Sequence, residues 1–237
     1  MSHPVAHPAA ARPLPRRLCL FDLDGTLIPI DSDHSFGEFM VRIGWADAET
    51  FKRRNDGFYA DYQAGTLDLA AYVDFATSVW RQRPVQELAA AQQRFMDEVL
   101  LPQLRPQAQA LVRRHQDAGD LVAIVTATNE FVTTPIARAF GVDHLLAVDL
   151  EREADGAWSG RIRGTPTFRE GKVVRVNDWL RSLGLTLEGF EQVAVYSDSI
   201  NDLPLLEMAS HPVATNPGAS LADVARERGW PILNLFS

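Results

Sequence analysis

The chain has 237 residues, of which 46% are apolar, and a formal net charge of −8. This length and composition predict one large domain, or a core domain with a smaller insert, that can bury a sizeable core. The acidic balance argues against a general nucleic-acid or membrane-surface binder, because either needs a basic surface. With Cys19 as its single cysteine, the chain cannot form an intrachain disulfide.

Residues 1–16 are rich in alanine, proline and histidine, and we expect a disordered tail there. The N-terminus lacks the hydrophobic region of a signal peptide. No apolar run approaches the length that spans a bilayer. These features predict a soluble cytoplasmic protein.

The first expected strand is a short apolar run over residues 18–21, which leads directly into Asp-Leu-Asp-Gly-Thr at 22–26. A run without polar alternation predicts a strand buried on both faces, as in a parallel sheet. Ligands in open α/β sheets bind beyond the carboxyl ends of the strands, where Asp22 and Asp24 stand. Two carboxylates this close repel each other unless one is protonated or a cation such as Mg²⁺ lies between them. The alternative is an ordinary Asp-Gly turn after a strand.

Residues 33–101 carry apolar side chains at helical spacing and contain no convincing strand. We expect about four helices packed on one another, inserted directly after the first strand. An insert at this place could cover the strand ends as a cap. An ordinary helical subdomain without a catalytic part is the alternative. The α/β core would then comprise residues 17–32 and 102–237.

From residue 102 onward strands and helices alternate, which is typical of a parallel α/β sheet. The expected fold is a doubly wound, Rossmann-like parallel sheet with an inserted α-helical subdomain. The further strands are expected over residues 121–125, 145–148, 193–197 and 211–215. The helices are expected over residues 107–118, 130–140, 173–183, 204–209 and 218–228, and a small hairpin around 157–163.

Reactive side chains stand at further expected strand ends and helix starts. Thr126 ends the second strand before a helix, where free backbone N–H groups favour an anion. Lys172 begins a helix, against the helix dipole, which hints at a function, although a solvated surface lysine is the alternative. Asp198 and Asp202 follow the fourth strand as a second acidic pair, and Asp202 or Asn201 could also be only a helix cap.

Together these groups suit phosphoryl transfer. Carboxylates can hold Mg²⁺ against a phosphate, while Thr126, Lys172 and helix starts can bind its other oxygens. One aspartate can attack phosphorus and form an aspartyl-phosphate. A second carboxyl can protonate the leaving oxygen and then activate water.

The four motifs at 22–26, 126, 172 and 198–202 resemble, in the same order, those of the haloacid dehalogenase superfamily. The helical insert after the first motif is similar to that of the superfamily's small-cap group, which includes phosphoserine phosphatase. The resemblance covers about residues 18–233. It implies a Mg²⁺-dependent phosphomonoester hydrolase that acts on a small phosphorylated metabolite through an aspartyl-phosphate.

The resemblance also implies residue roles. Asp22 would be the nucleophile, and Asp24 the general acid and base, whose backbone carbonyl also meets Mg²⁺. Asp198 would be a further metal ligand. Thr126 and Lys172 would hold the phosphoryl group.

Two neighbouring residues of the last motif take supporting roles by the same resemblance. Asp202 would support the surroundings of the metal or Lys172. Asn201 would contact the phosphate or the substrate.

The substrate is less closely defined by the resemblance. Phosphoserine phosphatases carry a glutamate that reads the substrate amine, and Asp31 falls nearest that position. They also carry a cap arginine for the substrate carboxylate, where an ungapped match places Asp74 or Phe75. Residues 126–129 and 163–169 resemble another branch of the group, some of whose members act on histidinol phosphate. The further substrate candidates are Asn129, Arg163 and Arg169.

Other functional classes compete with this interpretation. A signalling receiver module also places a phosphorylated aspartate, an acidic metal site, a threonine and a lysine on a doubly wound sheet. A receiver, however, needs neither Asp24 nor a helical insert. A non-catalytic binding module on the same fold is a third possibility, which Mg²⁺-dependent hydrolysis of a generic aryl phosphate would exclude.

Overall fold

The structure, a computed structural model, describes residues 16–236. Its main sheet is parallel, with the strand order β3-β2-β1-β6-β7-β8. The strands are β1 (Arg17–Phe21), β2 (Leu121–Asn129), β3 (His144–Val148), β6 (Gln192–Ser197), β7 (His211–Thr215) and β8 (Ile232–Leu233). The first strand, β1, lies in the middle of the sheet. Strands β2 and β3 are added on one side of it and β6, β7 and β8 on the other, which confirms the expected doubly wound topology. The expected tail lies outside the described residues apart from Arg16.

Successive residues of the central strands face opposite sides of the sheet and enter two separate apolar cores. In β1, Cys19 and Phe21 join one core, and Leu18 and Leu20 join the other. Helices α5 (Pro106–Asp117) and α6 (Glu130–Ala139) contribute to the first core. Helices α7 (Glu170–Ser182), α8 (Leu203–Met208) and α9 (Ala219–Arg228) contribute to the second. A strand buried on both faces needs a continuous apolar run, and this is why the sequence predicts these strands.

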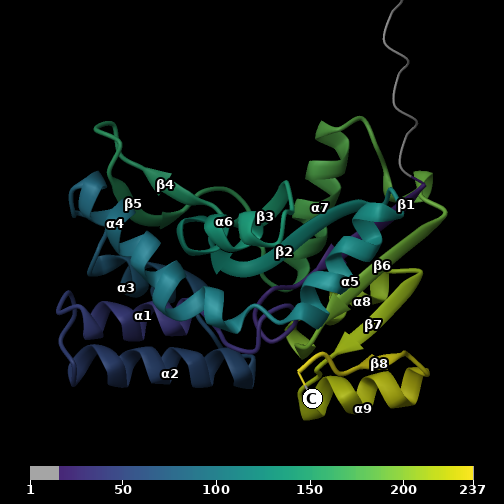
Figure 1. The fold of residues 1–237 in the computed structure, drawn as a ribbon, viewed down its shortest axis with the longest axis horizontal. Coiled ribbons are helices and arrows are strands. Elements are labelled where there is room, and N and C mark those ends of the chain that lie inside the picture. The colour runs from purple at the N-terminus through teal and green to yellow at the C-terminus, as the bar shows by residue number, and fades with distance from the viewer. Residues whose placement is uncertain (1–15, 237) are drawn as a thin grey trace, which may run out of the picture.

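Helices α1 (Ser32–Arg42), α2 (Thr50–Ala64), α3 (Leu69–Ser78) and α4 (Val85–Phe95) lie between β1 and α5 in the chain. A π-helical turn (Met96–Leu100) and a 3-10 turn (Leu101–Gln103) follow them. Figure 1 shows these helices gathered at one end of the molecule. The aromatic rings of Phe36 and Trp80 pack against Phe131 of α6. The insert therefore shares one apolar core with a face of the sheet.

The expected hairpin is formed by β4 (Leu150–Arg152) and β5 (Trp158–Ile162), which pair antiparallel and lie against α3. Trp158 meets the ring of Trp80 edge-on at 6.2 Å. Short 3-10 turns at Leu187–Gly189 and Ile200–Asp202 flank β6. The two-residue β8 was not expected, because so short an edge strand leaves no readable pattern. Strand β2 extends to Asn129, past the expected end at residue 125.

Candidate active site

The loops that follow β1 and β6 and the last residues of β2 meet at one edge of the sheet, as parallel strands require. Asp22 extends β1, since its backbone N–H donates to the carbonyl of Tyr196 at 2.9 Å. Lys172, in the first turn of α7, reaches this edge from the face of the sheet that α7 covers. Its side chain is buried, with 1% exposed. Its Nζ lies 2.7 Å from Asp22 Oδ1 and 2.7 Å from Asp202 Oδ2. The expected lysine is thus buried between two of the expected aspartates.

Lys172 is held in its charged form by this pairing. Burial lowers its pKa, but the carboxylates of Asp202 and Asp22 more than offset burial, so the pKa is raised. Burial also raises the pKa of Asp202, to about 6 against the opposing effect of Lys172. The hydroxyl of Ser197 donates to Asp202 Oδ2 at 2.7 Å. A buried ammonium without such partners would lose its proton, so Asp202 supports Lys172.

Asp198 lies beside the loop that carries Asp22. Thr26 links the two, with its hydroxyl 2.9 Å from Asp198 Oδ1 and 3.3 Å from Asp22 Oδ2. A Cβ at Gly25 would stand 2.2 Å from Asp198 Oδ2, so only glycine allows this approach. Asn216 holds the loop from the other side by donating to the carbonyl of Gly25 at 2.9 Å.

The pair of Asp22 and Asp198 fits a divalent cation. Burial raises the pKa of Asp198 well above its usual value, and the charge of Asp22 adds to the shift. Such a shift indicates a carboxylate without enough positive charge nearby. Carboxylate oxygens are also the ligands that Mg²⁺ prefers. The donor set and its electrostatics therefore agree with the expected metal.

Asp24 is oriented by two hydrogen bonds. Its Oδ1 accepts from the backbone N–H of Ser32 at 2.7 Å, and its Oδ2 accepts from the Thr128 hydroxyl at 2.8 Å. Burial, followed by the charge of Asp31, raises the pKa of Asp24 to about 7. A carboxyl with a pKa near neutrality can both give and take a proton at physiological pH.

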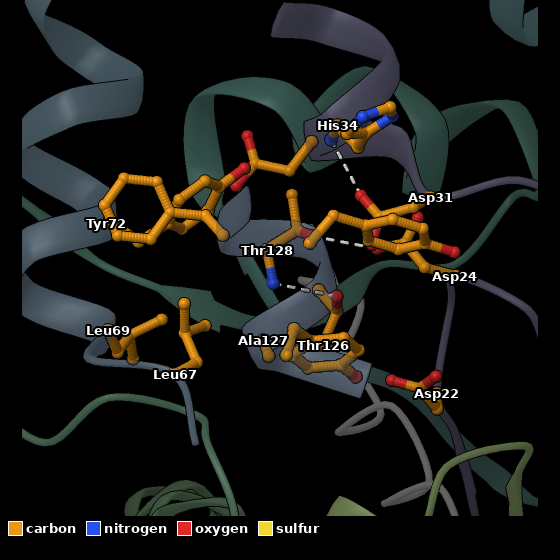
Figure 2. Close-up of a pocket in the computed structure, with 14 residues that line it drawn as sticks. Asp22, Asp24, Asp31, His34, Leu67, Leu69, Tyr72, Thr126, Ala127 and Thr128 are labelled. Atoms are coloured by element: carbon orange, nitrogen blue, oxygen red, sulfur yellow. Dashed lines mark hydrogen bonds between the residues drawn. The ribbon is translucent and has the colours of Figure 1, made fainter. Parts of the chain in front are cut away.

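A pocket extends from Asp22 toward the insert. Figure 2 shows Asp22 at one end and Tyr72, Leu67 and Leu69 at the opposite end, with residues 126–128 between them. The remaining lining comprises Asp24, Asp31, Asp33, His34, Phe58, Tyr59 and Tyr62. Within residues 16–236, no lysine or arginine lines this pocket. Its walls are therefore acidic and aromatic.

The two acidic residues of the insert side occupy the start of α1. Asp31 caps the helix, accepting from the backbone N–H of His34 at 2.7 Å, and burial raises its pKa. Asp33 is 8% exposed and accepts from Asn129 Nδ2 at 3.1 Å. Burial, then the charges of Asp31 and Asp24, raise the pKa of Asp33 to about 8. Asn129 also caps α6, so it reaches the pocket only through Asp33.

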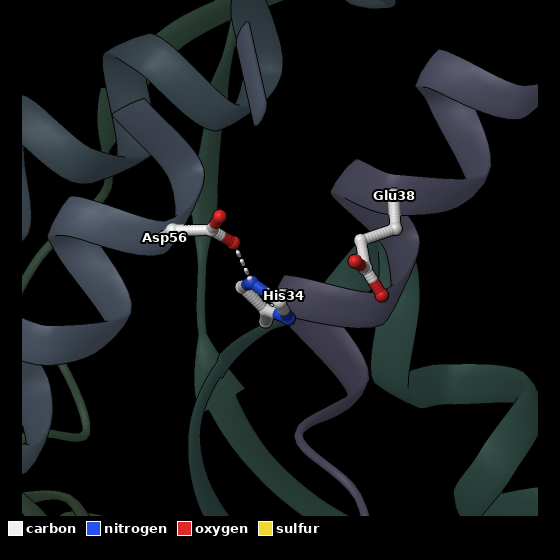
Figure 3. A group of neighbouring side chains, drawn as sticks. All are labelled: His34, Glu38 and Asp56. Carbon is white, nitrogen blue, oxygen red and sulfur yellow. Dashed lines mark hydrogen bonds and ion pairs between the residues drawn. The ribbon is translucent and has the colours of Figure 1, made fainter. Parts of the chain in front are cut away.

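His34 at the pocket wall connects to a polar cluster on the outside of the insert (Figure 3). Its Nε2 lies 2.8 Å from Asp56 Oδ1, and its ring packs on Tyr59 at 4.9 Å between centroids. His34, Glu38 and Asp56 are close enough to hold a metal ion. Lys52, however, donates to Asp56 at 3.0 Å and to Glu38 at 3.3 Å. This cluster is an ion-pair network that already contains its cation.

Three more of the expected residues lie outside this pocket lining. Arg163 is exposed, and its Nη2 lies 3.6 Å from Asp149 Oδ2. The guanidinium of Arg169 donates to the carbonyl of Gly65 at the end of α2. The side-chain amide of Asn201 donates to the carbonyl of Tyr62, one turn earlier, at 3.0 Å. Arg169 and Asn201 thus join the core to the insert.

Several hydroxyl residues that hold the site together were not singled out as site residues from the sequence. They are Thr26, Thr128 and Ser197, described above, and Thr167, whose Oγ1 donates to the carbonyl of Thr126 at 2.6 Å. Their only local signal is closeness to a motif. Each of these bonds joins separate segments or closes a loop, so it depends on the fold.

The family follows from comparison with known proteins. A family model described as haloacid dehalogenase-like hydrolase matches residues 19–207. The chain belongs to this family. The expectations of its fold and of a phosphomonoester hydrolase that acts on small molecules are confirmed. Within residues 16–236, no helix is long and apolar enough to cross a membrane.

Individual members of the family are similar over most of the chain. A histidinol-phosphatase of Neisseria meningitidis is 42% identical over 219 residues, which cover 92% of this chain and 99% of that protein. The phosphoserine phosphatase SerB1 of Mycobacterium tuberculosis is 32% identical over 238 residues, covering 98% of this chain and 76% of that protein.

Solved structures agree with the fold. A crystal structure of a protein with unknown function from Bordetella pertussis has 50% sequence identity and a TM-score of 0.89, covering 94% of this chain and 100% of that chain. A substrate-bound phosphoserine phosphatase shares the fold at 16% identity and a TM-score of 0.65, with 94% of both chains covered.

Proposed function

We propose that this hydrolase removes the phosphate from histidinol phosphate. The charge of the pocket carries the proposal. Asp31 and Asp33 face the space beyond the expected nucleophile, and within the described chain no lysine or arginine lines that space. Histidinol phosphate bears an amine and an imidazole but no carboxylate. The carboxylate of phosphoserine would be left without a partner here, which is costly for a buried charge. The 42% identity with a histidinol-phosphatase supports the same substrate.

Mg²⁺ is the proposed cofactor, held by the carboxylates of Asp22 and Asp198 and by the backbone carbonyl of Asp24. When bound, the ion neutralises charge on the phosphoryl oxygens. Lys172 and Thr126 bind the remaining phosphoryl oxygens in this proposal. The position of Lys172, 2.7 Å from Asp22, supports its role.

The proposed reaction has two steps. Asp22 attacks phosphorus, the bond from phosphorus to the alcohol oxygen breaks, and protonated Asp24 donates its proton to that oxygen. Asp24, now a carboxylate, then takes a proton from the water that attacks the aspartyl-phosphate, which releases phosphate and restores Asp22. The pKa of about 7 supports Asp24 in both directions of proton transfer.

Residues 33–101 act as the cap in this proposal, and residues 17–32 and 102–237 form the core. Tyr59 and Tyr62 of α2 line the pocket, and the contacts of Arg169 and Asn201 hold the end of α2 against the core. A cap that closes over the substrate keeps bulk water from the phosphoryl group. A cytoplasmic location stays a prediction from the sequence.

The test is phosphate release from histidinol phosphate and from phosphoserine, each with Mg²⁺ and with excess chelator. We expect kcat/KM for histidinol phosphate to be at least about 100-fold higher, because an unpaired buried charge is strongly rejected. The chelator should abolish release. Equal rates, or a preference for phosphoserine, would contradict the proposal. The Asp22→Asn variant measures background phosphate release.

A further inference from the structure

Asp33 is a buried carboxyl in the pocket wall to which the reaction assigns no task. We propose that Asp33 determines specificity by binding an N–H of the imidazole ring, while Asp31 binds the amine of the same leaving group. This inference rests on the proposed function. The insert side of the pocket would then recognise the leaving alcohol at two points, its amine and its ring.

The order of groups along the pocket matches the order of groups in the substrate. In histidinol phosphate the amine stands on the second carbon from the phosphate oxygen, and the ring follows one carbon further on. Asp31 lies close enough to Asp22 for their charges to act on each other. Asp33 lies beside Tyr72, which marks the end of the pocket away from Asp22 (Figure 2). An amine bound at Asp31 therefore leaves the ring facing Asp33.

The carboxyl of Asp33 is already positioned before any ligand binds. Its Oδ1 accepts from Asn129 Nδ2 at 3.1 Å, and Asn129 is fixed because its own oxygen caps α6. A side-chain hydrogen bond from Tyr72 also reaches this carboxyl, and the carboxylate has further lone pairs for a ligand N–H. Tyr72, Leu69 and Leu67 form aromatic and apolar walls on the same side, which suit a flat ring.

Asp33 has hydrogen-bond partners in Asn129 and Tyr72 but no cationic partner. Among the ion pairs of residues 16–236, none joins Asp33 to a lysine, arginine or histidine. Without a cation nearby this buried carboxyl stays mostly protonated, and a basic ligand that takes up its proton would let it ionise. Its pKa of about 8 agrees with a carboxyl that lacks its counter-charge. An imidazole supplies that charge, and the imidazole–carboxyl pair shares one proton without net uptake.

A matched pair of ligands separates ring recognition from amine recognition. L-Histidinol and L-phenylalaninol share the alcohol and the amine, but only histidinol has ring N–H groups. Titration calorimetry with Mg²⁺ would measure both ligands against the wild type, Asp33→Asn and Asp31→Asn. We expect Asp33→Asn to weaken histidinol by about 10-fold or more, as for the loss of a charged hydrogen bond, and phenylalaninol by less than about 3-fold. Asp31→Asn should weaken both ligands.

The inference is overturned if the wild type does not distinguish the two ligands, or if Asp33→Asn weakens both equally. Circular dichroism checks that each variant folds. Should Asp33→Asn not fold, Tyr72→Phe, which removes the hydroxyl beside Asp33, should still weaken histidinol selectively, and an unselective result again overturns the inference. If histidinol phosphate is not hydrolysed while the ligands still separate at Asp33, only the proposed function fails. If it is hydrolysed without that separation, only the ring site fails.

Discussion

Asp33 should cost the protein stability, so that Asp33→Asn makes it more stable. Burial and two neighbouring carboxylates raise the pKa of Asp33 from 3.8 to about 8. At pH 7 the unfolded chain gains the free energy of ionising this group, while the folded protein keeps it mostly protonated. That difference has an upper limit of about 4 kcal/mol at about 1.4 kcal/mol for each pKa unit.

The measured gain should be smaller than this limit. The asparagine carbonyl can still accept from Asn129, but its NH₂ group replaces the second carboxylate oxygen and disturbs the hydrogen bond from Tyr72, which costs about 1–3 kcal/mol. We therefore expect a net stabilisation of about 1–3 kcal/mol at pH 7. For a chain of this size each kcal/mol raises Tm by about 2–4 °C.

The stability gain of Asp33→Asn over the wild type must increase as pH rises. Between pH 3.8 and about 8 the folded state binds this proton more tightly than the unfolded state, so the stability of the wild type falls as pH rises. Near pH 4 the unfolded carboxyl is also about half protonated, so most of the penalty is gone. The stability gap should thus be largest near pH 8 and close toward pH 4.5.

Thermal unfolding of both proteins at pH 4.5 and pH 8, without metal or ligand, measures this gap. Asp61→Asn, at an exposed position on α2, is the matched control and should change stability by less than about 0.5 kcal/mol at either pH. A less stable Asp33→Asn variant at pH 8, or a gap that does not change with pH, would refute the reasoning.

Three further outcomes follow from the site. Asp22→Asn should lower phosphate release by about 10³-fold or more, because it removes the nucleophile, with an unchanged circular dichroism spectrum. Thr128→Val should raise the pKa of Asp24, because the hydroxyl bond that it removes stabilises the carboxylate form. The alkaline limb of the pH–rate profile should therefore move to higher pH. Arg169→Gly should be more stable than Arg169→Ala by about 1 kcal/mol in urea unfolding, because residue 169 has φ of 52° and both variants lose the bond to Gly65 equally.

Each outcome has its own control. Substantial phosphate release by Asp22→Asn would remove it as the nucleophile. Thr128→Ser keeps the hydroxyl and should retain the wild-type profile, so an equal shift in both variants would contradict the role of the bond. Equal stability of the glycine and alanine variants would show that the backbone at residue 169 carries no strain.

The phosphoryl end of the site could be predicted from the sequence because its groups follow contiguous signals. An apolar run buried on both faces marks each strand, and the carboxyl ends of parallel strands share one edge. Asp22, Thr126 and Asp198 therefore had to meet. Lys172 was visible as a cation at a helix start, although its bonds to two carboxylates depend on how α7 packs on the sheet.

The connections between core and insert could not be predicted in this way. An arginine near a phosphate site has the same local sequence whether it faces the substrate or another backbone. Arg169 and Asn201 were expected to meet the substrate or phosphate, and in the structure both donate to carbonyls at the end of α2. The difference is set by where α2 ends, which the local sequence of either residue does not contain.

By itself, then, the sequence determined the sheet, the helical insert and the chemistry at the strand ends, because each depends on neighbouring residues. Only the tertiary structure decided which residues form the pocket wall that we propose contacts the leaving group. At the start of α1, Asp33 has the pattern of an ordinary acid in a first helical turn. It becomes part of a pocket because Asn129 and Tyr72, about 96 and 39 residues away, pack around it. Distances between such remote segments are set by the packing of the insert on the sheet.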